Sequence, residues 1–367
     1  MNRLENLRKI WQKEGDAYFL FKPENLKIND LRYLTGFCGS TGIFLQTKQK
    51  NYLFVDERYF EGFKNQKSEN LEVILWNVNF KKVIKDIFKK EKVKKIVIDP
   101  YQSFGFIKGL EKILRGINFV VSKRAITLQL RVRKEEIEIE ILKTAQKITD
   151  KIFEEILNFI KPEKSTEKEI AFKIYELAIK KYRCEDLSFE PIIASGNASS
   201  ISRYKSENKK IKNNSSLLLD FGVVYQGYVS DMTISDMTRT LWIGNKIDPE
   251  FKKFYNIVLE AQKLAIEKCQ FKKPLKAKSV DKRVRDYFKK FGYDKYFIHS
   301  TGHGIGMDIH EAPTLGPYSK EILKGNELVT IEPGIYLEGR FGIRIEDIVI
   351  TGSGENITFS SKNLIRL

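Results

Sequence analysis

Short apolar runs alternate with helix-like stretches through the first 125 residues, and this alternation limits the folds that the chain can adopt. Runs rich in β-branched and aromatic residues predict strands at 17–21, 41–47, 51–60, 71–78 and 94–100. The segments 79–92 and 105–116 carry apolar residues at helical spacing, which predicts helices. Strands and helices in alternation indicate an α/β domain with a mixed sheet.

A long amphipathic pattern begins at Lys134 and marks a change of domain. Its apolar positions, three or four residues apart, are Ile141, Ala145, Ile148, Ile152 and Ile156. We place the boundary just before this helix, so that residues 1–130 form the first domain and residues 131–367 the second. Thr166 and Glu169 form a capping-box pattern, which predicts the start of a second helix.

The rest of the second domain mixes strands with two more helices. Two apolar runs in 215–233 flank Gln226 and Gly227, which predicts a hairpin with a two-residue turn. Helices are expected at about 249–269 and 279–291, followed by strands that glycine and proline interrupt. The predicted fold class is therefore α/β (α+β), with a small α/β domain followed by a larger mixed domain.

Length and composition indicate a globular chain. Its 367 residues are enough for two cores, and no run of about 18 apolar residues predicts a membrane span. Charges throughout the N-terminal segment do not match a signal peptide, so we expect a soluble protein without a membrane partner. The three cysteines are far apart and lack CxxC spacing, which argues against disulfides and makes the cytoplasm the expected location.

The formal net charge of +17 raises the question of a nucleic-acid partner. The lysines, however, are spread along the whole chain beside acidic residues, and no nucleic-acid-binding motif is present. We therefore expect a solvated, lysine-rich surface and no nucleic acid.

All three histidines lie within one segment, FIHSTGHGIGMDIHEAP, as His299, His303 and His310. Glycines between them let the backbone approach another group closely. The alternative is a glycine-rich turn with ordinary imidazoles. Titratable rings on a permissive backbone favour a functional site.

Three carboxylates supply partners for these imidazoles. Asp220, Glu332 and Glu346 each stand in an apolar, β-branched run, where an unpaired charge would be costly to bury. Oxygen ligands with one imidazole are typical of a site for Mn, Co, Fe or Zn ions. A structural zinc site would instead use Cys and His ligands. Two such ions would produce a water nucleophile at neutral pH and polarise a carbonyl.

With these segments identified, the chain resembles the Xaa-Pro aminopeptidases and Xaa-Pro dipeptidases (prolidases), metallopeptidases with the pita-bread fold. LRYLTGFCGSTGIFL and LFVDERYFE are similar to the N-terminal creatinase-like domain of that family, and LRVRKEEIEIEILKTAQKITD to its interdomain helix. Four more segments are similar to its catalytic motifs, LLLDFGVVYQGYVSDMT, STGHGIGMDIHEAP, VTIEPGIY and GIRIEDIVI. The resemblance covers nearly the whole chain.

The resemblance implies a set of roles for individual residues. Two metal ions would be held by Asp220, Asp231, His303, Glu332 and Glu346. His299 and His310 would face the substrate, Arg344 would orient Glu346, and Glu332 would assist the water as general base. The alternative for the two histidines is packing behind the site.

The resemblance also implies an activity and partners. The family hydrolyses the peptide bond before proline in proline-containing peptides, uses two divalent ions, with Mn or Co favoured over Zn or Fe, and forms homodimers. A pita-bread homologue that has lost catalysis and binds peptides or proteins is the alternative from another functional class.

One ligand is ambiguous because Ser-Asp-Met-Thr occurs twice, at 230–233 and 235–238. Asp231 has the family's spacing of eleven from Asp220, whereas Asp236 precedes the Thr-Arg-Thr that should follow the ligand. With a two-residue turn at Gln226 and Gly227, Gly222 would pair with Asp231, which would place Asp231 on the face of Asp220. This register favours Asp231, and only a bulge would restore Asp236.

The chain departs from the family at a second place. After ASGN the family has a histidine over the substrate, whereas this chain has Arg203 at the corresponding position. An arginine there could hold a C-terminal carboxylate or a carbonyl oxygen.

Overall fold

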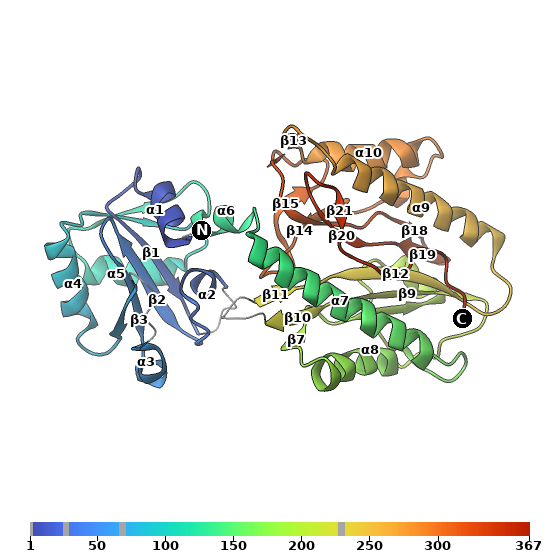
Figure 1. The fold of residues 1–367 in the computed structure, drawn as a ribbon, viewed down its shortest axis with the longest axis horizontal. Helices are drawn as coiled ribbons and strands as arrows, with labels where there is room; N and C mark the ends of the chain where they lie inside the picture. The colour runs from blue at the N-terminus through green and yellow to red at the C-terminus, as the bar shows by residue number, and fades with distance from the viewer. Residues whose placement is uncertain (1–2, 25–28, 66–70, 227–231) are drawn as a thin grey trace. The chain divides into compact units, whose positions relative to one another are not determined.

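The computed structural model describes residues 3–24, 29–65, 71–226 and 232–367, and they form two compact units (Figure 1). The first unit includes the chain up to Arg131. The second unit includes Val132–Gly227 and Met232–Leu367. The described helices include none long and apolar enough to cross a membrane.

The first unit is built on one six-stranded sheet in the order β4-β3-β2-β1-β5-β6. Its strands are β1 (Ala17–Lys22), β2 (Gly42–Thr47), β3 (Asn51–Val55), β4 (Leu71–Leu75), β5 (Lys95–Ile98) and β6 (Asn118–Val121). Only β2 runs antiparallel to its neighbours, because β1 pairs in parallel with β5, β3 with β4 and β5 with β6. The predicted mixed sheet is confirmed.

Helices accompany this sheet. They are α1 (Arg3–Trp11), α2 (Asp30–Thr35), α3 (Glu57–Phe63), α4 (Phe80–Lys90), α5 (Phe104–Ile113) and α6 (Ile126–Arg131). The predicted strand at 51–60 is wrong in its second half, where α3 begins after β3. Asp56 stops the strand because its carboxylate accepts a hydrogen bond from the backbone N–H of Arg58 and caps the helix.

Four longer helical segments belong to the second unit. They are α7 (Glu136–Phe159), α8 (Glu167–Glu176) with the π-helical turn η1 (Leu177–Lys181), α9 (Pro249–Lys268) and α10 (Lys278–Lys289). The capping box of Thr166 and Glu169 is present as predicted, and Glu135 and Glu138 form another at the start of α7. Asp248 caps α9 with Pro249 in its first turn.

One long hairpin and a later group of strands lie between these helices. The hairpin contains β9 (Ser215–Phe221), β10 (Val223–Gln226), β11 (Met232–Ile234) and β12 (Met237–Ile243). The later group includes β14 (Gly302–Gly304), β15 (Glu311–Leu315), β17 (Leu328–Ile331), β18 (Gly334–Leu337), β19 (Phe341–Arg344) and β20 (Asp347–Ile350). Strand β14 lies between β15 and β17 in one sheet, and β17 pairs on its other side with β20.

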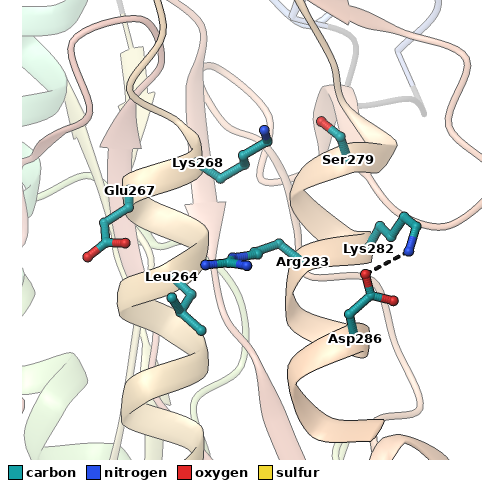
Figure 2. A pocket seen from close by; sticks show the side chains of 7 residues that line it. All are labelled: Leu264, Glu267, Lys268, Ser279, Lys282, Arg283 and Asp286. Carbon is teal, nitrogen blue, oxygen red and sulfur yellow. Dashed lines mark hydrogen bonds and ion pairs between the residues drawn. The ribbon is translucent and has the colours of Figure 1, made fainter. Parts of the chain in front are cut away.

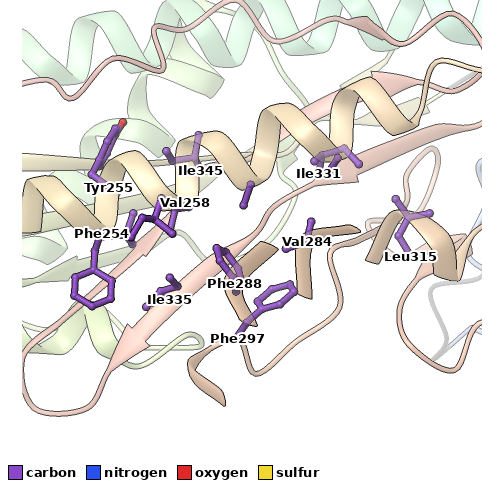
Figure 3. Close-up of a cluster of buried hydrophobic side chains, with 14 of the residues drawn as sticks. Phe254, Tyr255, Val258, Val284, Phe288, Phe297, Leu315, Ile331, Ile335 and Ile345 are labelled. Carbon is purple, nitrogen blue, oxygen red and sulfur yellow. The ribbon is translucent and has the colours of Figure 1, made fainter. Parts of the chain in front are cut away.

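Two apolar cores stabilise this unit. In one, Figure 3 shows Val258 of α9 and Phe288 of α10 in the same cluster as Ile331 and Ile335, which belong to β17 and β18. The other core joins the buried face of α7 to β9 and β12 through residues such as Ile152. The strands that carry the predicted site residues are therefore anchored by helices from both cores.

Candidate metal centre

The hairpin places the second copy of Ser-Asp-Met-Thr opposite Asp220. Thr238 pairs directly with Asp220, and Tyr225 pairs with Thr233. The predicted two-residue turn at Gln226 and Gly227 is wrong, since Gln226 pairs with Met232. Every pair is displaced by five positions from the predicted register.

Asp236 therefore occupies the place that the predicted register gave to Asp231. It lies two residues before Thr238, and alternate residues of a strand share a face, so Asp236 and Asp220 project to the same side. Asp231 itself lies outside the described residues. The side chain of Asp236 is 7% exposed.

Ser235 fixes the backbone immediately before Asp236. Its hydroxyl accepts a hydrogen bond from Val223 N at 2.9 Å and lies 2.7 Å from the hydroxyl of Thr149 on α7. Its carbonyl oxygen accepts from the hydroxyl of Ser188 at 2.8 Å and would lie 1.8 Å from a Cβ at position 222, so only glycine fits there. These contacts aim Asp236 into the site.

His303 on β14 presents one ring nitrogen to the carboxylates. Its Nδ1 lies 3.0 Å from the carbonyl oxygen of Gly304, which can only accept, so Nδ1 carries the hydrogen of the neutral ring. Burial lowers the pKa of His303 and favours that neutral form. Its Nε2 then has a free lone pair, 3.3 Å from Glu332 Oε1 and 4.0 Å from Asp236 Oδ2.

Two buried carboxylates, Asp236 and Glu346, lie close to His303. Ligand atoms of Asp236, His303 and Glu346 all lie within 4.8 Å of one another. Burial raises the pKa of Asp236 well above its ordinary value, and the charges of Asp220 and Glu332 raise it further. Burial and the charge of Asp236 act in the same direction on the pKa of Glu346.

The donor set fits divalent cations. Oδ1 of Asp220 and Oδ1 of Asp236 are buried and have no hydrogen-bond partner among the described residues. A buried carboxylate oxygen without a partner is costly, and a metal ion compensates that cost. Carboxylate oxygens with one neutral imidazole are hard to intermediate donors, which suit Mn, Co, Fe and Zn.

Arg344 and Thr238 hold two of the carboxylates. Arg344, at the end of β19, forms a buried ion pair with Asp220 and donates from Nε to the hydroxyl of Thr238 at 2.9 Å. That hydroxyl donates in turn to Glu346 Oε2 at 2.6 Å. Arg344, which was predicted to orient Glu346, therefore contacts Asp220 directly and reaches Glu346 through Thr238.

His299 is part of the same network. Its Nδ1 donates to the Ser300 carbonyl at 2.8 Å, which leaves Nε2 to accept from the hydroxyl of Tyr336 at 2.8 Å. The oxygen of Tyr336 accepts from Arg344 Nη1 at 2.8 Å, and burial raises the pKa of Tyr336 to about 12. Both nitrogens of His299 are thus engaged inside the protein.

His310 and Arg203 lie on the exposed side of the centre. The ring of His310 is exposed, and its centroid is 4.4 Å from that of His303. Arg203 is also exposed, and its preceding residue Ser202 accepts from Arg344 Nη1 at 3.4 Å through its carbonyl oxygen. Partial burial lowers the pKa of His310 to about 4, with smaller contributions from His303 and Arg203.

Several residues of the network were not singled out from the sequence. Thr238 and Tyr336 connect the predicted residues, Thr330 donates to Glu332 Oε1 at 3.2 Å, and Arg285 donates to the His299 carbonyl at 2.6 Å. The Thr-Arg-Thr that follows Asp236 was a usable signal for Thr238, because alternate residues of a strand face the same side.

A cavity of about 450 Å³ lies elsewhere, along α9 and α10. Figure 2 shows its lining, in which Lys282 Nζ donates to Asp286 Oδ2 at 2.6 Å. No predicted site residue lines it. The chemistry of the chain therefore gathers at the carboxylate cluster rather than in this groove.

Comparison with known proteins identifies the family of the chain. Residues 140–352 match metallopeptidase family M24, and residues 3–133 match the creatinase/prolidase N-terminal domain. The Xaa-Pro dipeptidase of Pyrococcus horikoshii is 34% identical over 326 residues, which is 88% of this chain and 88% of the relative. These matches confirm the predicted fold class, a creatinase-like domain followed by a pita-bread domain.

Solved structures of similar chains give the same result. The Xaa-Pro dipeptidase from Bacillus anthracis superposes with a TM-score of 0.89 at 34% identity, covering 100% of this chain and 99% of the other. The X-Pro aminopeptidase from Thermotoga maritima superposes with a TM-score of 0.87 at 30% identity, covering 99% and 100%. The resemblance in the motifs is confirmed: the chain belongs to metallopeptidase family M24 and is a metallo-exopeptidase.

Proposed function

We propose that the protein is a dinuclear-metal exopeptidase that hydrolyses the peptide bond before proline. The observation that carries this proposal is the approach of the Asp236, Glu332 and Glu346 carboxylates to His303, with Asp236 and Glu346 buried. The names of the similar proteins, Xaa-Pro dipeptidase and X-Pro aminopeptidase, support the substrate class.

The proposed ligands are Asp220, Asp236, His303, Glu332 and Glu346. Asp236 replaces Asp231 in the predicted set because it is buried on the face of Asp220, close to His303 and Glu346. Its partnerless oxygen is a second argument for a ligand at this position.

When bound, two divalent ions would supply a water nucleophile at neutral pH and polarise the scissile carbonyl. The chain's own residues perform the other tasks. Glu332 lies beside His303 at the centre and is proposed as the general base. Arg344 and Thr238 hold Asp220 and Glu346 in place.

His310 is exposed next to His303, in a position to contact a peptide. His299 has both ring nitrogens engaged, so it acts on the site through Tyr336 and Arg344 unless a substrate displaces one of these bonds. Arg203 presents a positive charge on the same exposed side, where a carboxylate or carbonyl oxygen of the substrate could bind.

We further propose Mn or Co as the metal and a homodimer as the assembly, as the family resemblance implies. The cysteine spacing supports the cytoplasm as the location.

Hydrolysis of Ala-Pro and Ala-Pro-Ala by the purified protein, with Mn or Co added, tests this function. Asp236→Asn and Asp231→Asn are matched variants, since each removes one charge from a copy of the same four residues. We expect Asp236→Asn to abolish cleavage and lower the metal content, with Asp231→Asn close to wild type. The ratio of the wild-type rates for Ala-Pro and Ala-Pro-Ala distinguishes a dipeptidase from an aminopeptidase.

Two outcomes would contradict the proposal. Loss of activity in Asp231→Asn alone would return the ligand to the first copy. No cleavage of either peptide with any metal would favour a binding module that has lost catalysis.

A further inference from the structure

Lys134 and Glu311 form a buried ion pair beside the histidine segment. Lys134 Nζ lies 2.8 Å from Glu311 Oε2, and each side chain is 3% exposed. Lys134 precedes α7, and Glu311 is the first residue of β15, directly after His310. Two opposite charges so deeply buried must keep their geometry, because breaking the pair would leave a buried charge uncompensated.

Glu311 closes the loop that carries His310. Its backbone pairs with Gly304, so residues 305–310 form a loop between the two. Its Oε1 accepts from the backbone N–H of Asp308 inside that loop at 3.1 Å. One carboxylate thus binds the loop with one oxygen and Lys134 with the other.

Gly306 shows how closely the loop fits over this pair. A Cβ at position 306 would lie 2.8 Å from both carboxylate oxygens of Glu311 and 2.9 Å from Cε of Lys134. The Gly306 carbonyl accepts from Ile234 N at 2.9 Å, which ties the loop to β11. The pair, the loop and the hairpin that carries Asp236 are therefore packed together without spare space.

We propose that Lys134 is a positioning residue for His310, acting through Glu311 on the loop 305–310. The inference rests on the proposed function in one respect, namely that His310 contacts the peptide. His310 follows a loop held at both ends, by Gly304 pairing and by the Lys134–Glu311 bond, and its ring lies against His303. Loss of the ammonium group releases Glu311 and with it the orientation of His310.

Histidine imidazole NMR tests the proposal independently of activity, because the chain has only three histidines. Lys134→Met, Glu311→Gln and Gly306→Ala are compared with wild type by signals of labelled imidazole carbons. We expect the His310 signal to move most, His303 less and His299 least. Glu311→Gln keeps an acceptor for Asp308 N, so this variant is expected to fold even if Lys134→Met does not.

The matched controls come from the ion pair of Arg131 with Asp30, in the first unit. Its atoms are 2.9 Å apart, the arginine side chain is 3% exposed, and Arg131 lies only three residues before Lys134 in the sequence. Arg131→Met and Asp30→Asn should lower the melting temperature about as much as their counterparts, yet leave all three imidazole signals in place.

Kinetics give the second readout. We expect Lys134→Met to lower kcat/KM for Ala-Pro about 10-fold with unchanged metal content, as for other orienting partners. Equal effects of Lys134→Met and Arg131→Met on stability, with no imidazole signal moved, would overturn the proposal. If wild type cleaves no proline peptide, the proposed function fails while the NMR comparison still decides the role of Lys134.

Discussion

Two adjacent residues of β12 build two buried polar networks that differ in one respect. Arg239 makes five hydrogen bonds, including those to Asp347 Oδ1 at 2.7 Å and to the Glu346 carbonyl at 2.6 Å. Asp347 Oδ2 accepts from Asn356 and Lys362 as well. On the opposite face of the strand, Thr238 belongs to the carboxylate cluster, where Oδ1 of Asp220 and Oδ1 of Asp236 have no partner among the described residues.

The contrast separates structure from function. A buried charge that only stabilises the fold has every donor and acceptor paired, as Asp347 and Arg239 have. The cluster instead concentrates like charges and leaves acceptors unpaired, which destabilises the metal-free fold and creates affinity for cations. The first network should therefore respond to mutation in stability, and the second in metal binding.

The largest effect is expected from Asp347→Ala. Removing the carboxylate leaves the buried Arg239 without its charge partner, so the free energy of unfolding should fall by about 3–5 kcal/mol. Denaturant titration measures it. Asp286→Ala, which breaks the exposed pair with Lys282, should cost less than about 1 kcal/mol. Equal losses in the two variants would remove the distinction between the networks.

A smaller effect is expected from Thr238→Val. The hydroxyl that links Arg344 to Glu346 is lost while the shape of the side chain is kept, so metal affinity should fall about 10–100-fold. Isothermal titration with Mn measures it. Thr240→Val is the matched control, because that hydroxyl contacts only the backbone of Arg344. If both valine variants bind metal alike, Thr238 has no special role.

The smallest effect is a pH dependence of the metal-free protein. Burial raises the pKa of Asp236 and Glu346, so the folded chain retains protons that the unfolded chain releases above about pH 4. Unfolding free energy should thus fall as pH rises through the raised values, by at most about 1.4 kcal/mol per pH unit for each proton. The melting temperature, followed upward from about pH 4, measures it.

Histidine acts in the opposite direction over part of this range. The pKa of His303 is lowered below its ordinary 6.5, so its contribution raises stability as the pH rises to about 6.5 and is constant above that value. Asp236→Asn should flatten the dependence, and saturating metal should remove it because the ions need ionised ligands. The same slope with and without metal would show that the cluster does not control it.

Much of the fold followed from local patterns. Periodicity and capping residues predicted α7, α8, α9 and α10, and apolar runs predicted strands β1 to β5 of the first unit, whereas β6 was not predicted. The strand prediction failed at Asp56, where a cap changed the structure within one apolar-aromatic run. Apolar residues in a short run indicate burial in a strand or in a helix alike. The capping side chain of Asp56 is what distinguishes α3 from a continuation of β3.

The site was predicted less evenly. The parity argument about Asp231 and Asp236 was sound, since residues an odd number apart face opposite sides of a strand. Its premise, the two-residue turn, was wrong, and a shift of five positions reversed the answer. Turn length depends on long-range pairing of β9 with β12, which a local dipeptide signal does not report.

The register of that hairpin has a consequence for how such a site can evolve. The strand is anchored beyond its turn by the contact of Ser235 with Thr149 and by the pairing of Thr238 with Asp220. A duplication in the turn can therefore add residues without displacing the strand that carries Thr238. The sequence Ser-Asp-Met-Thr occurs twice, and selection for the carboxylate cluster then acts on the second copy, which pairs with β9. The other copy is released to drift, or to acquire a task of its own.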